Sequence, residues 1–124
     1  MSRVRVVLID DEPVLCRLLS RILERRADAE VVTFTDPERA LAHLQEAEVD
    51  VVFCDYRMPR MSGGELRRRL HRDVPFYIVT GELAAVDRVR EVPGVEGVIE
   101  KPVPPERLVE VARSHAPGAT APPD

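Results

Sequence analysis

Three acidic residues of this chain come directly after short apolar runs, where their carboxylates could bind a metal ion. Asp10 and Asp11 follow residues 4–9, and Asp55 follows residues 49–54. Carboxylates that lie close together repel one another and favour a bound cation, and ligands that are all oxygen favour a hard one. Mg²⁺ suits such a site because it keeps several waters and leaves room for a phosphoryl group. The pattern predicts a magnesium site with Asp55 as a nucleophile.

A hydroxyl and an amine follow two further apolar runs. Thr80 follows residues 76–79, and Lys101 follows residues 95–99 through Glu100. Lys101 is the only lysine among 18 basic residues, so its place at the end of an apolar run favours a function. A hydroxyl and a compact ammonium charge can both bind the equatorial oxygens of a phosphoryl group during transfer. These residues add a phosphate clamp to the predicted site.

The apolar runs alternate with segments of helical period, and this alternation predicts an α/β fold with a parallel sheet. We expect five strands at residues 4–9, 30–34, 49–54, 76–79 and 95–99, and five helices at 13–26, 37–47, 65–72, 82–92 and 105–115. Right-handed crossovers favour a flavodoxin-like doubly wound sheet of order 2-1-3-4-5. The carboxyl ends of its strands share one edge, so the polar residues should meet there.

Composition limits the class of protein. The chain has 124 residues, 44% of them hydrophobic, and a net charge of −4, which fits one globular domain and argues against direct binding to nucleic acid. No apolar stretch approaches the roughly 20 residues that span a bilayer, so we expect a cytoplasmic protein without a membrane partner. Cys16 and Cys54 match no metal or redox spacing and are predicted to be buried.

Four motifs together resemble the receiver domains of two-component response regulators. They are VLIDDEP, FCDYRMP, IVTG and GVIEKP, and the likeness covers about residues 4–115. We therefore expect a receiver domain at residues 1–115 and a flexible tail or the start of a linker at residues 116–124. The resemblance implies a cytoplasmic phosphoacceptor that catalyses its own phosphorylation and dephosphorylation, and not an enzyme that turns over a free substrate.

The resemblance also implies roles for the acidic residues. Asp55 would accept a phosphoryl group from the phosphohistidine of a sensor histidine kinase or a histidine phosphotransfer protein. Asp11 and Asp55 would bind Mg²⁺ directly together with the main-chain carbonyl of Arg57, and Asp10 would do so directly or through water. The downstream protein target, the cognate kinase and pathway, the oligomeric state and the phosphoryl lifetime stay open, as does whether the domain stands alone or begins a longer protein.

Thr80 and Lys101 would each turn to a phosphoryl oxygen and so repack the surface of helix 4, strand 5 and helix 5. The Lys101–Pro102 bond resembles one that the family often holds in cis. One position departs from the family pattern, because Val98 stands where an aromatic residue is common. Either the coupling to the partner surface runs through Thr80 and backbone movement alone, or the domain passes the phosphoryl group onward in a phosphorelay and needs little conformational output. We expect Val98 in the core more readily than in an exposed apolar patch.

Arg57 and Glu82 each lie two residues beyond a predicted site residue, on adjacent loops. We expect an ion pair across the mouth of the site, which would hinder attacking water and lengthen the phosphoryl lifetime. The basic run of Arg67, Arg68, Arg69 and Arg72 is expected to be a solvated helix face, and His43, His71 and His115 are expected at the surface.

Three rival functions fit the residues less well. An aspartate-nucleophile phosphatase of the haloacid dehalogenase kind needs a second Asp two residues after the nucleophile, where this chain has Arg57. A flavodoxin-type FMN carrier needs a phosphate cradle after the first strand, where acidic residues would repel the phosphate. A receiver retained as an unphosphorylated scaffold is disfavoured because every expected site residue is present.

Overall fold

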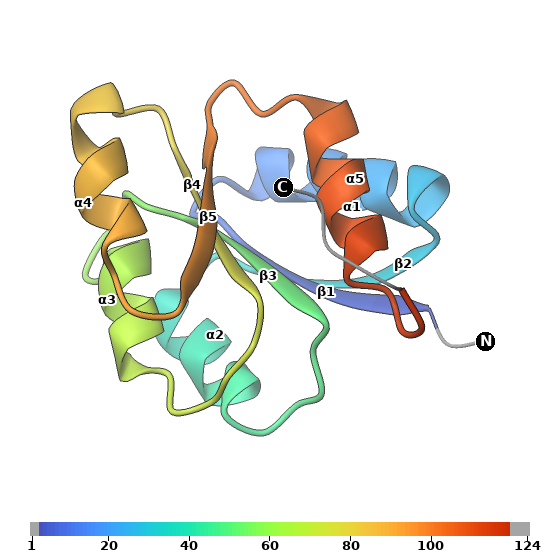
Figure 1. The fold of residues 1–124 in the computed structure, drawn as a ribbon, viewed down its shortest axis with the longest axis horizontal. Helices are drawn as coiled ribbons and strands as arrows, with labels where there is room; N and C mark the ends of the chain where they lie inside the picture. The colour runs from blue at the N-terminus through green and yellow to red at the C-terminus, as the bar shows by residue number, and fades with distance from the viewer. Residues whose placement is uncertain (1–2, 120–124) are drawn as a thin grey trace.

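The centre of the molecule is a parallel sheet of five strands in the order β2-β1-β3-β4-β5, which confirms the predicted topology (Figure 1). The structure is a computed structural model that describes residues 3–119. Both β3 and β4 are buried along their whole length, as expected for strands that are covered on both faces. The strands are β1 (Val4–Ile9), β2 (Ala29–Phe34), β3 (Val51–Asp55), β4 (Phe76–Thr80) and β5 (Val95–Glu100).

Helices cover both faces of this sheet (Figure 1). One face carries α1 (Pro13–Arg26) and α5 (Pro105–Ser114), and the other carries α2, α3 and α4. Alternate residues of each strand therefore face different helices, and the hydrophobic core divides into two clusters. The three helices on the face opposite α1 and α5 are α2 (Pro37–Leu44), α3 (Gly63–Arg69) and α4 (Val86–Arg90).

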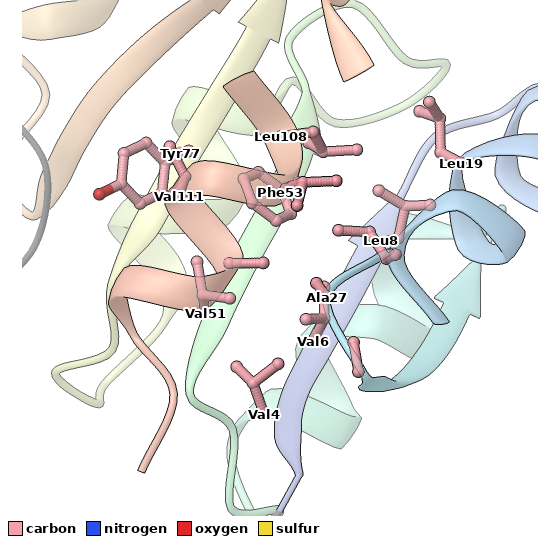
Figure 2. Close-up of a cluster of buried hydrophobic side chains, with 14 of the residues drawn as sticks. Val4, Val6, Leu8, Leu19, Ala27, Val51, Phe53, Tyr77, Leu108 and Val111 are labelled. Atoms are coloured by element: carbon pink, nitrogen blue, oxygen red, sulfur yellow. The ribbon is translucent and has the colours of Figure 1, made fainter. Parts of the chain in front are cut away.

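The cluster beneath α1 and α5 holds the centre of the sheet in place (Figure 2). Phe53 of β3 is fully buried there, and its ring centroid lies 5.8 Å from that of Tyr77 on β4. Leu8 of β1 and Leu108 of α5 belong to the same cluster. Removing a large side chain such as Phe53 would cost about 3–5 kcal/mol of unfolding free energy. The carboxyl ends of β1 and β3 are thus fixed by a close-packed core.

The predicted helix at residues 82–92 is shorter than expected. The structure has a 3-10 turn, η1 (Leu83–Ala85), that leads into the five residues of α4. No side chain caps the start of either element, and β-branched Val86 and Val89 are weak helix formers. This segment is therefore the least regular of those that cover the sheet.

The prediction of a solvated face for the basic run was wrong for Arg67, which is only 8% exposed. Its guanidinium donates to the carbonyls of Gly94 and Leu70, both at 3.2 Å, and lies over the ring of Phe76. These carbonyls supply the acceptors that a buried guanidinium needs. Two histidines also depart from the surface expectation, because His43 and His115 are both half-buried. His115 is hydrogen-bonded to Tyr77, and the ring centroid of His43 lies 5.1 Å from that of Phe34.

The predicted tail at residues 116–124 is described only in part. Residues 116–119 form a turn in which the amide of Ala119 donates to the carbonyl of Ala116, and residues 120–124 lie outside the described part of the chain. Among the residues that the structure describes, no helix has the length and apolar character to cross a membrane. Cys16 and Cys54 are both buried, as predicted.

Candidate functional site

The register of the sheet brings the three predicted acids together. Ile9 of β1 pairs with Cys54 of β3, so the next residues along each strand, Asp10 and Asp55, lie side by side at the carboxyl edge. Asp11 follows in the loop that leads to α1. One carboxylate oxygen from each of the three lies within 4.8 Å of the others. The acidic cluster that the sequence predicted is therefore present.

Lys101 reaches this cluster from the end of β5. Its Nζ lies 3.0 Å from Oδ1 of Asp55 and 3.7 Å from Oδ2 of Asp10. The Lys101 amide donates to the carbonyl of Thr80 at 2.9 Å, which anchors the start of the side chain next to β4. The peptide bond that follows, Lys101–Pro102, is cis, as the family resemblance implied. The only ammonium side chain of the sequence thus lies against the predicted nucleophile.

Burial and charge change the acid strengths in the site. Burial raises the pKa of the Asp10 and Asp55 carboxyls, and the neighbouring carboxylates raise both further. Lys101 opposes the rise in the pKa of each acid. Burial lowers the pKa of Lys101, but the hydrogen bond and charge of Asp55 and the charges of Asp10 and Glu12 together outweigh it, so the pKa of Lys101 is raised. The ammonium is therefore held in its charged form beside the acids.

The donor set of this pocket fits a divalent cation. Three carboxylates face a single ammonium group, so the cluster carries an excess of negative charge that a cation would neutralise. Asp10 uses Oδ1 to accept a hydrogen bond from the amide of Glu12 at 2.9 Å, which orients its carboxylate. All these side-chain donors are oxygens, which favours a hard ion such as Mg²⁺ over a soft metal.

Thr80 is at the predicted edge of the sheet, as the last residue of β4 and only 2% exposed. Its Oγ1 accepts a hydrogen bond from the amide of Glu82 at 3.0 Å. The hydroxyl therefore holds the start of the loop that leads to η1. A turn of this hydroxyl toward a new acceptor would release that amide.

The expected ion pair between Arg57 and Glu82 is confirmed. The guanidinium Nε and Nη2 of Arg57 donate to the two carboxylate oxygens of Glu82 at 2.8 and 2.7 Å. Arg57 also lies over the ring of Tyr56, 5.5 Å from its centroid. This contact involves only the side chain of Arg57, and the expected role of its carbonyl as a metal ligand stays a prediction.

Sequence reasoning missed one residue that shapes the site, Gly63 at the start of α3. A Cβ at this position would lie 2.6 Å from the main-chain carbonyl oxygen of Asp55, closer than a Cβ atom approaches such an oxygen. The Gly63 amide donates to the carbonyl of Tyr56 at 2.9 Å. The signal in the sequence is the glycine itself, shortly after the candidate nucleophile, because glycine allows a close approach of backbone segments.

The two buried cysteines also contact the backbone of the site. The Cys16 thiol donates to the carbonyl of Asp10, and the Cys54 thiol donates to the carbonyl of Asp55, both at 3.3 Å. Burial raises the pKa of the Cys16 thiol to about 11, so it stays protonated and able to donate. Weak donors of this kind help to orient both strand ends.

Comparison with known proteins agrees with this geometry. The chain is 34% identical over 112 residues to the cyclic di-GMP phosphodiesterase response regulator RpfG of Xanthomonas campestris, covering 83% of this chain and 29% of that protein. It is 33% identical over 109 residues to the transcriptional regulatory protein FlgR of Helicobacter pylori, covering 86% of this chain and 28% of that protein. The chain thus spans less than a third of the length of these two relatives.

Solved structures show the same fold. The chemotaxis response regulator CheY4 of Vibrio cholerae has a TM-score of 0.79 and 28% identity, with 92% of this chain and 99% of that chain covered. A Francisella receiver domain has a TM-score of 0.82 at 18% identity, with 91% and 96% covered. The sequence model of the response regulator receiver domain family matches residues 6–113 of this chain, which include the acidic cluster and Lys101. The chain therefore belongs to the response regulator receiver domain family of two-component signalling.

Proposed function

We propose that Asp55 accepts a phosphoryl group from a phosphohistidine on a sensor histidine kinase or a histidine phosphotransfer protein. The observation that carries this proposal is the contact of 3.0 Å between the Lys101 ammonium and the Asp55 carboxylate inside an acidic cluster. A nucleophile, a cationic clamp and a set of hard metal ligands then lie within one pocket. These are the parts that phosphoryl transfer requires.

In the proposed step, a carboxylate oxygen of Asp55 attacks the phosphorus atom in line with the phosphorus–nitrogen bond of the donor. A phosphorus–oxygen bond forms, the phosphorus–nitrogen bond breaks, and the imidazole nitrogen keeps the electron pair and takes up a proton. The product is an acyl phosphate on Asp55 and a neutral histidine. Lys101, already charged and in contact, moves from the carboxylate to a phosphoryl oxygen as negative charge accumulates there.

Asp10, Asp11 and Asp55 would hold Mg²⁺, with the main-chain carbonyl of Arg57 as a further ligand. The bound ion would neutralise charge on the phosphoryl oxygens during transfer. Asp10 is oriented for this role by the amide of Glu12. The excess of carboxylates over ammonium in the pocket supports a requirement for the ion, because the anionic donor would otherwise be repelled.

The conformational change caused by phosphorylation would reach the surface through Thr80. When its hydroxyl turns to a phosphoryl oxygen, the Glu82 amide loses its acceptor, and the loop before η1 must rearrange. Val98 is half-buried and packs against the core cluster that includes Val89 of α4. We infer that the signal passes to the surface of α4, β5 and α5 through this backbone movement, without an aromatic side chain at position 98. An unidentified protein that reads this surface is the proposed downstream partner.

The rival functions remain weaker on this geometry. Arg57 stands where a phosphatase of the haloacid dehalogenase kind needs its general acid, and its guanidinium is engaged by Glu82. The loop after β1 carries the acids Asp10, Asp11 and Glu12 where an FMN carrier needs a phosphate cradle. Both observations favour a phosphoacceptor.

Intact-protein mass spectrometry after treatment with acetyl phosphate tests the proposal. The wild-type chain should gain the mass of one phosphoryl group in the presence of Mg²⁺ and lose most of that gain when the metal is chelated. Asp55→Asn should show no adduct, whereas the matched variant Asp73→Asn, at an exposed acid outside the pocket, should behave as the wild type. An adduct that persists in Asp55→Asn would refute the proposal.

A further inference from the structure

The helices α3 and α4 cover the same face of the sheet (Figure 1). Residues of both helices line a hollow of about 230 Å³. Arg68 of α3 and Arg88 of α4 both line it. The hydroxyl-bearing residues Tyr56 and Ser62 line it as well. The hollow therefore presents cationic and hydrogen-bonding side chains from three separate segments, and the phosphotransfer chemistry uses none of them.

The positive charge of this hollow is not paired by a direct contact, although the charge of Arg88 acts on the carboxylate of Glu82. Within residues 3–119, neither Arg68 nor Arg88 takes part in a salt bridge or a side-chain hydrogen bond. Their neighbours differ in this respect, because Arg67 binds two carbonyls and Arg69 pairs with Glu38. Two guanidiniums that face one cavity repel each other, so an anion between them would be stabilised.

Gly64 lines the hollow beside Arg68. It is buried, and a Cβ at this position would lie 3.8 Å from both Nη1 of Arg68 and Oγ of Ser62. The guanidinium of Arg68 is thus folded back toward the start of its helix. Ser62 accepts a hydrogen bond from the amide of Glu65, and its hydroxyl hydrogen is left to donate.

We propose that this hollow binds an acidic side chain of a protein partner, with the carboxylate between Arg68 and Arg88. The wall formed by Val89 and Val92 would receive an aliphatic neighbour of that acid. Planar guanidinium groups match a carboxylate in bidentate geometry, which supports this assignment. The volume is below the roughly 300–1,000 Å³ that small-molecule sites occupy, so a side chain fits it better than a whole metabolite.

This inference goes beyond the proposed phosphotransfer and does not depend on it. The occupant would lie beside the pocket, because Tyr56 directly follows Asp55 and Ser62 precedes Gly63, whose backbone approaches Asp55. Binding is to be measured without metal or phosphodonor. A failure of phosphorylation would then leave the result on docking unaffected. A failure of docking would likewise leave the result on phosphorylation unaffected.

The test is a titration of the ¹⁵N-labelled chain, followed by amide chemical shifts, with a blocked hexapeptide of alternating leucine and aspartate. We expect shifts at Ser62, Gly64 and Val92, and at the two arginines. The double variant Arg68→Gln/Arg88→Gln should lower the apparent affinity by about tenfold or more, because each lost charged hydrogen bond is costly. A charge-matched control, Arg25→Gln/Arg90→Gln, removes two exposed arginines outside the hollow and should bind as the wild type.

Three outcomes would overturn the inference. In the first, millimolar peptide leaves the amides around the hollow unshifted. In the second, a peptide with asparagine in place of aspartate shifts them equally, so that charge plays no part. In the third, the control variant loses as much affinity as the double variant.

Discussion

Arg57 and Glu82 form a bidentate ion pair from the loops that follow β3 and β4, with both nitrogen–oxygen distances below 3 Å. Arg57 lies two residues beyond the proposed nucleophile, and Glu82 lies two residues beyond Thr80. The hydrogen bond and charge of Arg57 lower the pKa of Glu82, so the carboxylate stays ionised at neutral pH. The pair therefore bridges the two loops beside the acidic pocket.

Breaking this pair should shorten the lifetime of the phosphoryl group. Without the bridge, water reaches the acyl phosphate more easily, so Arg57→Ala and Glu82→Ala should each lose the group faster, by roughly two- to fivefold. The effect is small because both side chains are exposed to solvent. The measurement is the decay of the intact-mass adduct after removal of acetyl phosphate.

The exchanged double variant, Arg57→Glu with Glu82→Arg, is the control for this prediction. It restores an ion pair with reversed polarity and should recover part of the lifetime that the single variants lose. Unchanged half-lives in both alanine variants would rule out a shielding role for the pair.

Magnesium should stabilise the folded chain, because it relieves the repulsion among the three carboxylates. At a Mg²⁺ concentration ten times its Kd, mass action raises the free energy of unfolding by about 1.4 kcal/mol. Asp11→Asn removes one proposed ligand and should require several times more Mg²⁺ for the same rise in Tm. Thermal unfolding over a Mg²⁺ series checks this, and identical series for wild type and variant would exclude Asp11 as a ligand.

Stability should depend on the protonation of His115, whose ring nitrogen Nε2 is hydrogen-bonded to the Tyr77 hydroxyl at 2.8 Å. Burial lowers the pKa of His115 below its ordinary value, although Glu96 opposes the shift. As the pH falls through about 6.5, His115 therefore becomes protonated in the unfolded chain while it stays neutral in the folded chain. The free energy of unfolding that His115 contributes above this pH is lost as the pH falls toward the pKa of His115 in the folded chain.

Urea unfolding at pH 7.5 and pH 5.5 measures this dependence. His115→Gln should reduce the loss of stability between the two pH values by on the order of 0.5 kcal/mol, since the residue is only half-buried. Asp10 and Asp55 titrate alike in wild type and variant, so their contribution cancels in the comparison. An equal loss in both proteins would contradict the prediction.

Gly63 and Gly64 offer a matched pair of substitutions. Gly63→Ala places a methyl group 2.6 Å from the Asp55 carbonyl oxygen and should cost about 1–3 kcal/mol while slowing phosphorylation. In Gly64→Ala the nearest atom is 3.6 Å away, in ordinary contact, and alanine favours the helix. This second variant should be neutral or stabilising by up to about 1 kcal/mol, and equal effects at both positions would contradict the close approach at Gly63.

The strand ends were predictable from sequence, because buried parallel strands appear as apolar runs and parallel register carries their ends to one edge. Asp10, Asp55 and Thr80 followed from that rule alone, with errors of one or two residues in the strand bounds. The ion pair between Arg57 and Glu82 followed in the same way. The sheet fixes the position of a residue that ends a strand or lies just beyond it.

Other features depend on contacts between distant segments, which local pattern does not encode. Arg67 lies in an arginine run that is typical of a solvated helix, but its guanidinium is buried by Phe76 and by the Gly94 carbonyl 27 residues away. The hydrogen bond between Tyr77 and His115 likewise joins a strand to the end of the last helix. The close approach of Gly63 to Asp55 also needs the three-dimensional path of the loop.

The most direct test of the central claim is to identify the residue that carries the phosphoryl group. Borohydride reduces an acyl phosphate to an alcohol, so an aspartyl phosphate becomes homoserine, which peptide mass spectrometry can locate. After treatment with acetyl phosphate and Mg²⁺, we predict homoserine at position 55 and none there when Mg²⁺ is chelated. Homoserine at another acid, with position 55 unmodified, would contradict the account.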